Sequence, residues 1–205
     1  VVEAARGAVA DHLRRHGFKN FTITSTRAFE TIFKISYEII GEPKISIIIP
    51  NKDHVEDLRR CITSIEKKST WKNYEIVVVE NNSVEQSIRD YYKELESDPK
   101  VKIVTYEGGF NYSRINNVGV KETKGEYLLF LNNDTEVISP DWMEQLLMYA
   151  QRKDVGAVGA KLYYADNTIQ HAGVVIGLGA HRSAGHTHYK MPREHLGYMG
   201  RLCYA

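Results

Sequence analysis

The sequence has few cysteines and no long apolar run. Cys61 and Cys203 are the two cysteines among 205 residues, which is too few for a disulfide framework or a cysteine-based metal cluster. This scarcity favours a reducing, cytoplasmic setting. No apolar stretch reaches the length that a membrane-spanning helix needs. We therefore expect any association with the inner face of a membrane to come from regions outside this sequence.

The sequence also lacks an excess of charge and the glycine-rich loops that bind phosphates. Lys and Arg number 27 against 26 Asp and Glu, a formal net charge of +1, so we expect no basic surface for nucleic acid. There is no Gly-x-Gly-x-x-Gly segment and no Gly-Lys-Ser/Thr loop. Both absences argue against dinucleotide-binding and P-loop proteins.

The sequence does contain a regular alternation of two patterns. Four apolar runs predict strands, at 44–50, 75–80, 101–106 and 127–131. Helical spacing of apolar residues predicts helices over 55–65, 88–95, 111–123 and 140–150. The run at 127–131 is continuous enough to predict a strand buried on both faces, and residues 155–160 are expected to return to the sheet. The alternation predicts an α/β fold with a mostly parallel, Rossmann-like sheet flanked by helices.

The two ends of the sequence differ from this alternating part. Residues 1–42 predict a helix followed by edge strands and contain no recognisable chemistry, so we interpret them as a lead-in. A second domain is expected over 43–205. After residue 161 the sequence is rich in glycine and histidine, which predicts irregular structure. We expect the second domain to be incomplete at its C-terminus.

Polar residues follow three of the predicted strands at the point where each strand ends. They form the segments 50–53 (Pro-Asn-Lys-Asp), 80–83 (Glu-Asn-Asn-Ser) and 132–134 (Asn-Asn-Asp). Ligands of open α/β sheets bind at the carboxyl ends of the strands. Amides and carboxylates there can hydrogen-bond a base and a ribose, and a carboxylate can hold a hard cation through oxygen. The plainer alternative is that these segments are polar turns, because Asn and Asp are ordinary turn residues.

Four segments together resemble the family 2 glycosyltransferases, which have the GT-A fold. They are Ile47–Asp53, Val77–Ser83, Asn111–Gly119 and Phe130–Thr135, in the order and at the spacing usual for that family. The likeness covers about residues 44–190. It is greatest to the bacterial branch that builds cell-surface polysaccharides, including rhamnosyltransferase-like members. The resemblance implies a domain that binds a nucleotide-diphosphate sugar.

The resemblance also implies roles for individual residues. Contacts with the donor are implied for eight residues, namely Pro50, Asn51, Asp53, Glu80, Asn82, Asn117, Asn132 and Asn133. Glu80 stands where the family more often has Asp. Read without the resemblance, Glu80 is a solvated strand end, and Asn116 and Asn117 are surface amides of a helix.

A divalent cation, Mn²⁺ or Mg²⁺, is implied at Asp134, which matches the last Asp of the family's Asp-x-Asp motif. Asn132 replaces the first Asp of that motif, so the cation site is expected to be weaker than one with two carboxylates. If a histidine of the His-rich region joins the site, we expect it to be His186, although ordinary surface or core histidines are the plainer interpretation.

The resemblance implies an inverting enzyme that transfers the sugar to a saccharide or lipid-linked acceptor during cell-surface polysaccharide synthesis. Such an enzyme needs a base to deprotonate the acceptor. No residue matches the family's base motif, so we expect the base beyond Ala205 and expect this chain mainly to bind the donor and not to transfer by itself. Two alternatives stay open. A sugar-nucleotidyltransferase would need a glycine-rich basic loop, which residues 51–54 do not supply. The second alternative is a non-enzymatic nucleotide-sugar-binding module, which only the acceptor-binding half would distinguish from the enzyme.

Overall fold

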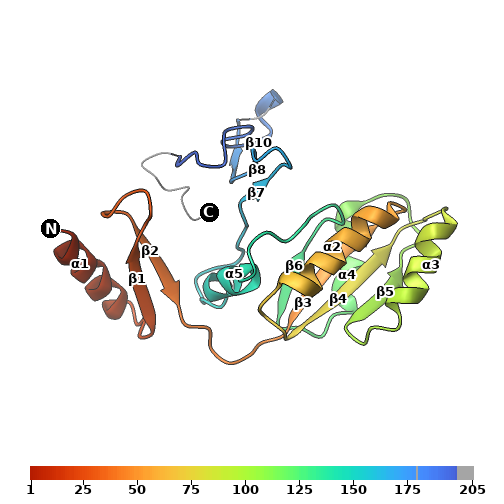
Figure 1. Ribbon diagram of the computed structural model, residues 1–205, viewed down its shortest axis with the longest axis horizontal. Helices are drawn as coiled ribbons and strands as arrows, with labels where there is room; N and C mark the ends of the chain where they lie inside the picture. Colours follow the sequence, from red (N-terminus) through yellow and green to blue (C-terminus); the bar gives the residue numbers. More distant parts are fainter. Residues whose placement is uncertain (179, 198–205) are drawn as a thin grey trace. The chain divides into compact units, whose positions relative to one another are not determined.

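The structure is a computed structural model that describes residues 1–178 and 180–197 (Figure 1). The chain divides into two compact units. One is formed by Ile40–Gln145. The other combines Val1–Ile39 with the segment that begins at Leu146, so the boundary falls within helix α5 (Trp142–Ala150). Cys203 lies outside the described residues.

A four-stranded parallel sheet forms the centre of the Ile40–Gln145 unit. Its strands are β3 (Ile45–Asn51), β4 (Tyr74–Glu80), β5 (Val101–Thr105) and β6 (Tyr127–Phe130). They lie in the order β5-β4-β3-β6. Strand β3 is therefore internal, and Ile47, Ile48 and Ile49 are fully buried in it, as expected for a strand covered on both faces. The predicted α/β fold with a parallel sheet is confirmed.

Three helices connect these strands and cover the sheet (Figure 1). They are α2 (Val55–Lys68), α3 (Gln86–Leu95) and α4 (Tyr112–Lys121). Helix α4 begins at Asn111, whose side-chain oxygen accepts a hydrogen bond from the backbone N–H of Arg114 and so caps the helix. Ile115 of α4 packs on Ile48, Val77 and Val79 of the sheet. This packing holds α4 against β3 and β4.

Two predictions about strands are wrong. Strand β6 is not buried on both faces: it lies at the edge of the sheet, and Leu128 and Phe130 are 42% and 51% exposed. Residues 155–160 form no strand. Their glycines and alanines provide little side-chain surface to pack, so nothing compensates the entropy of ordering them as a strand. Without a neighbour on that side, β6 alternates between half-buried and exposed positions.

The other unit contains helix α1 (Val2–Arg15) and an antiparallel pair, β1 (Phe21–Ser25) and β2 (Phe33–Tyr37). Its core contains Leu13, Tyr37 and Met148, so it joins segments from the two ends of the chain. The Tyr149 hydroxyl donates to the backbone oxygen of Ile35 at 2.7 Å. This contact ties the end of α5 to β2.

The histidine-rich region belongs to the same unit and consists of short elements. It contains strands β7 (Leu162–Tyr163), β8 (Ile169–His171), β9 (Val174–Ile176) and β10 (Ala184–His186), and the 3₁₀ helix η1 (Ala180–Arg182). Strand β7 pairs with β8, and β9 pairs with β10, both antiparallel. The expected departure from the βα alternation after residue 161 is therefore present.

Candidate functional site

The carboxyl ends of β3 and β4 bring two predicted site residues to the same level of the sheet. Asn51 ends β3, Glu80 ends β4, and the two are register partners. The loop after the neighbouring strand β6 contains Asn132, Asn133 and Asp134. Three of the polar segments found in the sequence thus meet at one edge of a parallel sheet, the position where ligands of such sheets bind.

Asn51 is the centre of a hydrogen-bond network that connects these loops. It is 3% exposed. Its amide nitrogen donates to the hydroxyl of Tyr92 at 2.7 Å and to the backbone oxygen of Asp53 at 3.0 Å. Its amide oxygen accepts from the amide nitrogen of Asn133 at 2.6 Å. A buried amide must satisfy its donors and its acceptor, so Asn51 fixes the loops after β3 and β6 against each other.

Glu80 is held by the loop that follows its own strand and by helix α3. Its carboxylate accepts from the hydroxyl of Ser83 at 2.6 Å and from the hydroxyl of Tyr92 at 2.5 Å. The backbone N–H of Ser83 also donates to it. Burial, followed by the hydrogen bond to Glu80, raises the pKa of Tyr92 above its usual value. Glu80 is therefore an anchored acceptor and not a solvated strand end.

Asp53 closes the loop after β3 onto the loop after β4. Its backbone has a positive φ of 53°, a conformation that Asp tolerates better than most residues. One carboxylate oxygen accepts from the backbone N–H groups of Glu85, at 3.0 Å, and Val84, at 2.8 Å. These bonds, the one from Glu85 first, lower the pKa of Asp53. The carboxylate thus has a structural task in addition to any contact with a ligand.

Asn81 and Asn82 point toward the loop that precedes α4. The amide nitrogen of Asn81 donates to the backbone oxygens of Tyr106 and Gly108, at 3.0 and 2.8 Å. The amide nitrogen of Asn82 donates to the oxygen of Gly108 at 2.9 Å. Their amide nitrogens therefore position the 106–108 loop at the same edge of the sheet.

The loop after β6 lies over a buried cysteine. The thiol of Cys61 donates to the backbone oxygen of Asn132 at 3.7 Å and lies 3.6 Å from the hydroxyl of Thr135. Burial raises the pKa of Cys61 to about 11, so the thiol stays protonated at neutral pH and acts as a packing group. Asp134 itself is exposed. Its loop is held by the contacts of Cys61 with Asn132 and Thr135.

Two other predicted residues are not joined to this network. Asn117 is exposed on α4, whereas its neighbour Asn116 is buried and donates to the backbone oxygen of Tyr112 at 2.8 Å. The amide oxygen of Asn116 is buried without a hydrogen-bond partner in the described part of the chain. His186 belongs to the other unit, where its Nδ1 lies 3.0 Å from Nδ1 of His171. Burial, followed by the charge of His186, lowers the pKa of His171.

No group of three or more His, Cys, Asp or Glu residues suited to a metal ion occurs within residues 1–178 and 180–197. In the loop after β6, the carboxylate of Asp134 is exposed. Mg²⁺-type ions are commonly held by one or two carboxylates together with phosphate oxygens of the substrate and water. The residues therefore fit a cation that arrives with a phosphorylated ligand better than one held by the protein alone.

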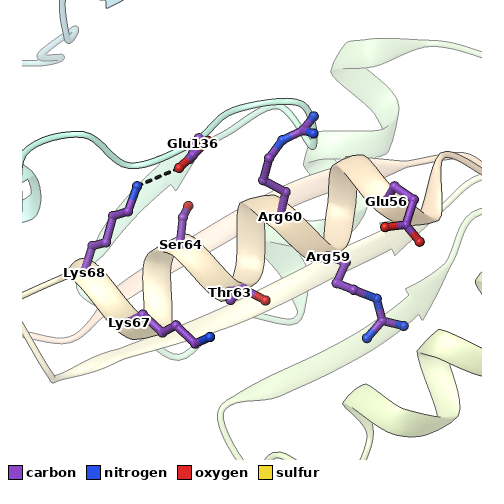
Figure 2. A pocket seen from close by; sticks show the side chains of 8 residues that line it. All are labelled: Glu56, Arg59, Arg60, Thr63, Ser64, Lys67, Lys68 and Glu136. Atoms are coloured by element: carbon purple, nitrogen blue, oxygen red, sulfur yellow. Dashed lines mark hydrogen bonds and ion pairs between the residues drawn. The ribbon is translucent and has the colours of Figure 1, made fainter. Parts of the chain in front are cut away.

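A separate hollow of about 390 Å³ lies along α2 (Figure 2). It is lined by Arg59, Arg60, Lys67 and Lys68 of the helix and by Glu136 from the loop after β6. Lys68 pairs with Glu136 at 2.6 Å, and Arg59 pairs with a glutamate of α3 at 3.0 Å. None of the predicted donor-binding residues lines it, so this hollow is distinct from the sheet edge described above.

Sequence analysis did not place Tyr92 and Cys61 at the site. Tyr92 lies in the predicted helix over 88–95, four residues after Ile88 and so on its apolar side. A buried tyrosine hydroxyl usually needs a partner, and that rule was the available signal. Cys61 offers no such signal, because its contacts arise only once the loops are folded against one another. Ser83 is the last residue of the polar segment 80–83 that the sequence predicted at the strand end.

Known proteins resemble this chain in sequence. The model of glycosyl transferase family 2 matches residues 46–196. The protein y4gI of Sinorhizobium fredii is 42% identical over 201 residues, which are 98% of this chain and 22% of that protein. The O-antigen biosynthesis protein RfbC of Myxococcus xanthus is 39% identical over 187 residues, which are 90% of this chain and 14% of that protein. The chain thus spans less than a quarter of the length of either relative.

A solved structure supports the fold. The mannosyltransferase PcManGT from Pyrobaculum calidifontis, in complex with GDP-Man and Mn²⁺, matches with a TM-score of 0.51 and 14% identity over 76% of this chain and 42% of that chain. At this identity the match shows a shared fold. The expected GT-A fold is therefore confirmed.

Proposed function

Since the chain belongs to glycosyl transferase family 2, we propose that it is the donor-binding part of an enzyme that transfers a sugar from a nucleotide diphosphate during cell-surface polysaccharide synthesis. The observation that carries this proposal is the network in which Asn51 joins Tyr92 and Glu80 to Asn133 at the carboxyl edge of the sheet. The O-antigen biosynthesis relative supports the polysaccharide context.

In this proposal the loops after β3 and β4 hold the base and ribose of the donor. Glu80 already accepts three hydrogen bonds from Ser83 and Tyr92. A carboxylate has about four acceptor sites, so one remains for a donor group of a base or ribose. One carboxylate oxygen of Asp53 accepts from two backbone N–H groups. In this proposal its other oxygen accepts a hydrogen bond from the base or ribose. The network orients both carboxylates before the ligand arrives.

Asp134, which is exposed in the loop after β6, is the residue that would hold Mn²⁺ or Mg²⁺. A bound cation of this kind would act as a Lewis acid and stabilise the departing diphosphate. Asn132 and Asn133 flank this carboxylate without adding charge, and Asn133 is held by Asn51. The Mn²⁺ and GDP-Man in the Pyrobaculum structure support a divalent cation and a nucleotide sugar here.

Inverting transfer to a saccharide or lipid-linked acceptor completes the proposal. The acceptor hydroxyl must lose a proton as it attacks, and general-base help is worth about 10²–10⁴-fold. No described residue is assigned as this base.

No helix in residues 1–178 or 180–197 is long and apolar enough to cross a bilayer. The cytoplasmic location expected from the low cysteine content stays a prediction.

The experiment that tests donor binding is calorimetry with a panel of nucleoside diphosphates and their sugars. GDP, UDP and dTDP compounds are each titrated with Mg²⁺, with Mn²⁺ and with a chelator. We expect one base to bind best and to require the divalent cation. Absence of binding by every compound with either cation would contradict the proposal. A transfer assay with the full-length protein and saccharide acceptors then separates an enzyme from a binding module.

A further inference from the structure

His171 and His186 form a close pair in the histidine-rich region. His171 ends β8 and His186 ends β10. Their Nδ1 atoms are 3.0 Å apart, and the rings meet edge to face with centroids 5.2 Å apart. His186 is exposed and His171 is partly buried. The two Nδ1 atoms are therefore close enough for one ion to reach both.

The backbone around the pair holds this convergence. The hydroxyl of Thr187 donates to the backbone oxygen of Ala172 at 3.0 Å, and its N–H donates to the oxygen of Gly173 at 3.0 Å. His186 is also the register partner of Val174 in the β9–β10 pair. Gly173 has a φ of +114°, which side-chain-bearing residues rarely adopt. The residues next to each histidine are thus bonded to one another, so the pair is built into the fold.

The spacing of the two nitrogens fits two ligands of one metal ion. Imidazole nitrogen lies 2.0–2.1 Å from Zn²⁺, so two such ligands are roughly 3.0 Å apart at a right angle and roughly 3.3 Å apart at the tetrahedral angle. A single shared proton explains the same spacing as an N–H···N hydrogen bond, in which one ring donates and the other accepts. The two states use the same Nδ1 atoms, and an ion would replace the shared proton.

We propose that His171 and His186 form a two-histidine site for a nitrogen-preferring divalent ion, of which Zn²⁺ is the representative, with water in the remaining positions. No third protein ligand is available in the described part of the chain, so the ion is exchangeable. The site differs in chemistry from Asp134, because imidazole suits Zn²⁺, Ni²⁺ and Cu²⁺, whereas isolated carboxylates suit Mg²⁺ and Mn²⁺. The proposal does not rest on the proposed function.

The test is a calorimetric titration of the whole chain with Zn²⁺ in excess Mg²⁺. His171→Gln and His186→Gln are each expected to weaken zinc binding about tenfold or more, since each removes one of two protein ligands. His12→Gln is the matched control, because His12 and His16 form another histidine pair, on α1, with centroids 4.4 Å apart. Zinc binding that falls in His12→Gln and stays unchanged in His171→Gln would overturn the proposal.

A second measurement on the unaltered chain covers the case in which a variant does not fold. Nitrogen-15 spectra of the histidine side chains distinguish a protonated ring nitrogen from a metal-bound one. We expect zinc to move the Nδ1 signals of His171 and His186 together while their Nε2 signals remain protonated. If saturating zinc leaves both Nδ1 signals unchanged, the pair is only a hydrogen bond and the proposal is wrong.

Discussion

Tyr92 is the residue that connects the ends of the two central strands. Its hydroxyl accepts from Asn51 and donates to Glu80, so one buried group satisfies an amide and a carboxylate at once. The same contacts orient Glu80 toward the sheet edge. Stability and donor binding are therefore expected to depend on the same oxygen atom.

Replacing Tyr92 with Phe should cost about 1–3 kcal/mol of unfolding free energy, because Asn51 and Glu80 each lose a hydrogen bond and one N–H of the buried Asn51 amide is left unpaired. It should also weaken nucleotide binding, since Glu80 loses one of its anchors. Tyr91→Phe is the matched control: Tyr91 is buried beside it on the same helix and stacks under Arg59. Urea denaturation followed by tryptophan fluorescence measures the unfolding free energy of both variants. Equal losses of unfolding free energy in the two variants would contradict the role assigned to the Tyr92 hydroxyl.

Asp134 provides the clearest test of the cation. Asp134→Asn keeps the size of the side chain and removes its charge, so nucleoside diphosphate binding should become weaker and should no longer depend on Mn²⁺. Glu136→Gln is the control, because that exposed carboxylate two residues away pairs with Lys68. Calorimetry with Mn²⁺ and with a chelator gives the comparison. Unchanged cation dependence in Asp134→Asn would show that another group holds the ion.

At the scale of elements, the sequence predicted the strands and helices of the parallel sheet but not the position of β6. Continuous apolar runs are typical of buried strands, and β3 and β4 follow this rule. Strand β6 has the same kind of run and yet lies at the edge. Burial of an edge strand depends on what else packs beside it, and that information is not contained in the run itself.

The site, like the sheet, could be predicted only in part from the sequence. The rule that ligands bind at strand ends correctly placed Asn51, Glu80 and Asn133 together. It could not show that these side chains bind one another, because such contacts depend on loop conformations such as the positive φ of Asp53 and Asn82. His186, the histidine expected if one joined the cation site, pairs with His171 in the other unit, and its place at the cation stays a prediction.

Gly119 sets the distance between α4 and the sheet. A Cβ at this position would lie 2.6 Å from Cγ2 of Ile48 and 2.9 Å from Cγ2 of Val79, closer than carbon atoms approach. Gly119→Ala should therefore destabilise the unit by about 1–3 kcal/mol, the usual cost of overpacking, despite the better helix propensity of Ala.

Gly109→Ala is the matched control for this variant, since a Cβ at Gly109 meets nothing within 4 Å. Denaturant midpoints of both variants and the parent chain give the result. A Gly119→Ala variant as stable as the parent would mean that α4 can move away from the sheet at little cost. In that case Ile115 would not hold the helix as tightly as its burial suggests.

At the scale of the whole molecule, each of the two compact units contains a hydrophobic cluster of its own. Ile48, Val77, Val79 and Ile115 form one of them, within the Ile40–Gln145 unit. Leu13, Tyr37 and Met148 form the other, which joins the beginning of the chain to the segment after residue 145. Both tryptophans, Trp71 and Trp142, belong to the Ile40–Gln145 unit. Tryptophan fluorescence therefore reports on one unit only.

We predict that the two units unfold separately. Large-to-small substitutions in a core cost about 2–5 kcal/mol, so Ile115→Ala should lower the urea midpoint of the tryptophan signal. Leu13→Ala should leave that midpoint unchanged and should instead speed amide exchange in α1, β1 and β2, measured by mass spectrometry of peptides. Nucleotide with Mn²⁺ should raise the tryptophan midpoint in the parent chain and in Leu13→Ala alike, because a ligand stabilises the unit that binds it. If Leu13→Ala lowers the tryptophan midpoint as much as Ile115→Ala does, the chain unfolds as one cooperative body, and the donor site depends on residues 1–39 for its stability.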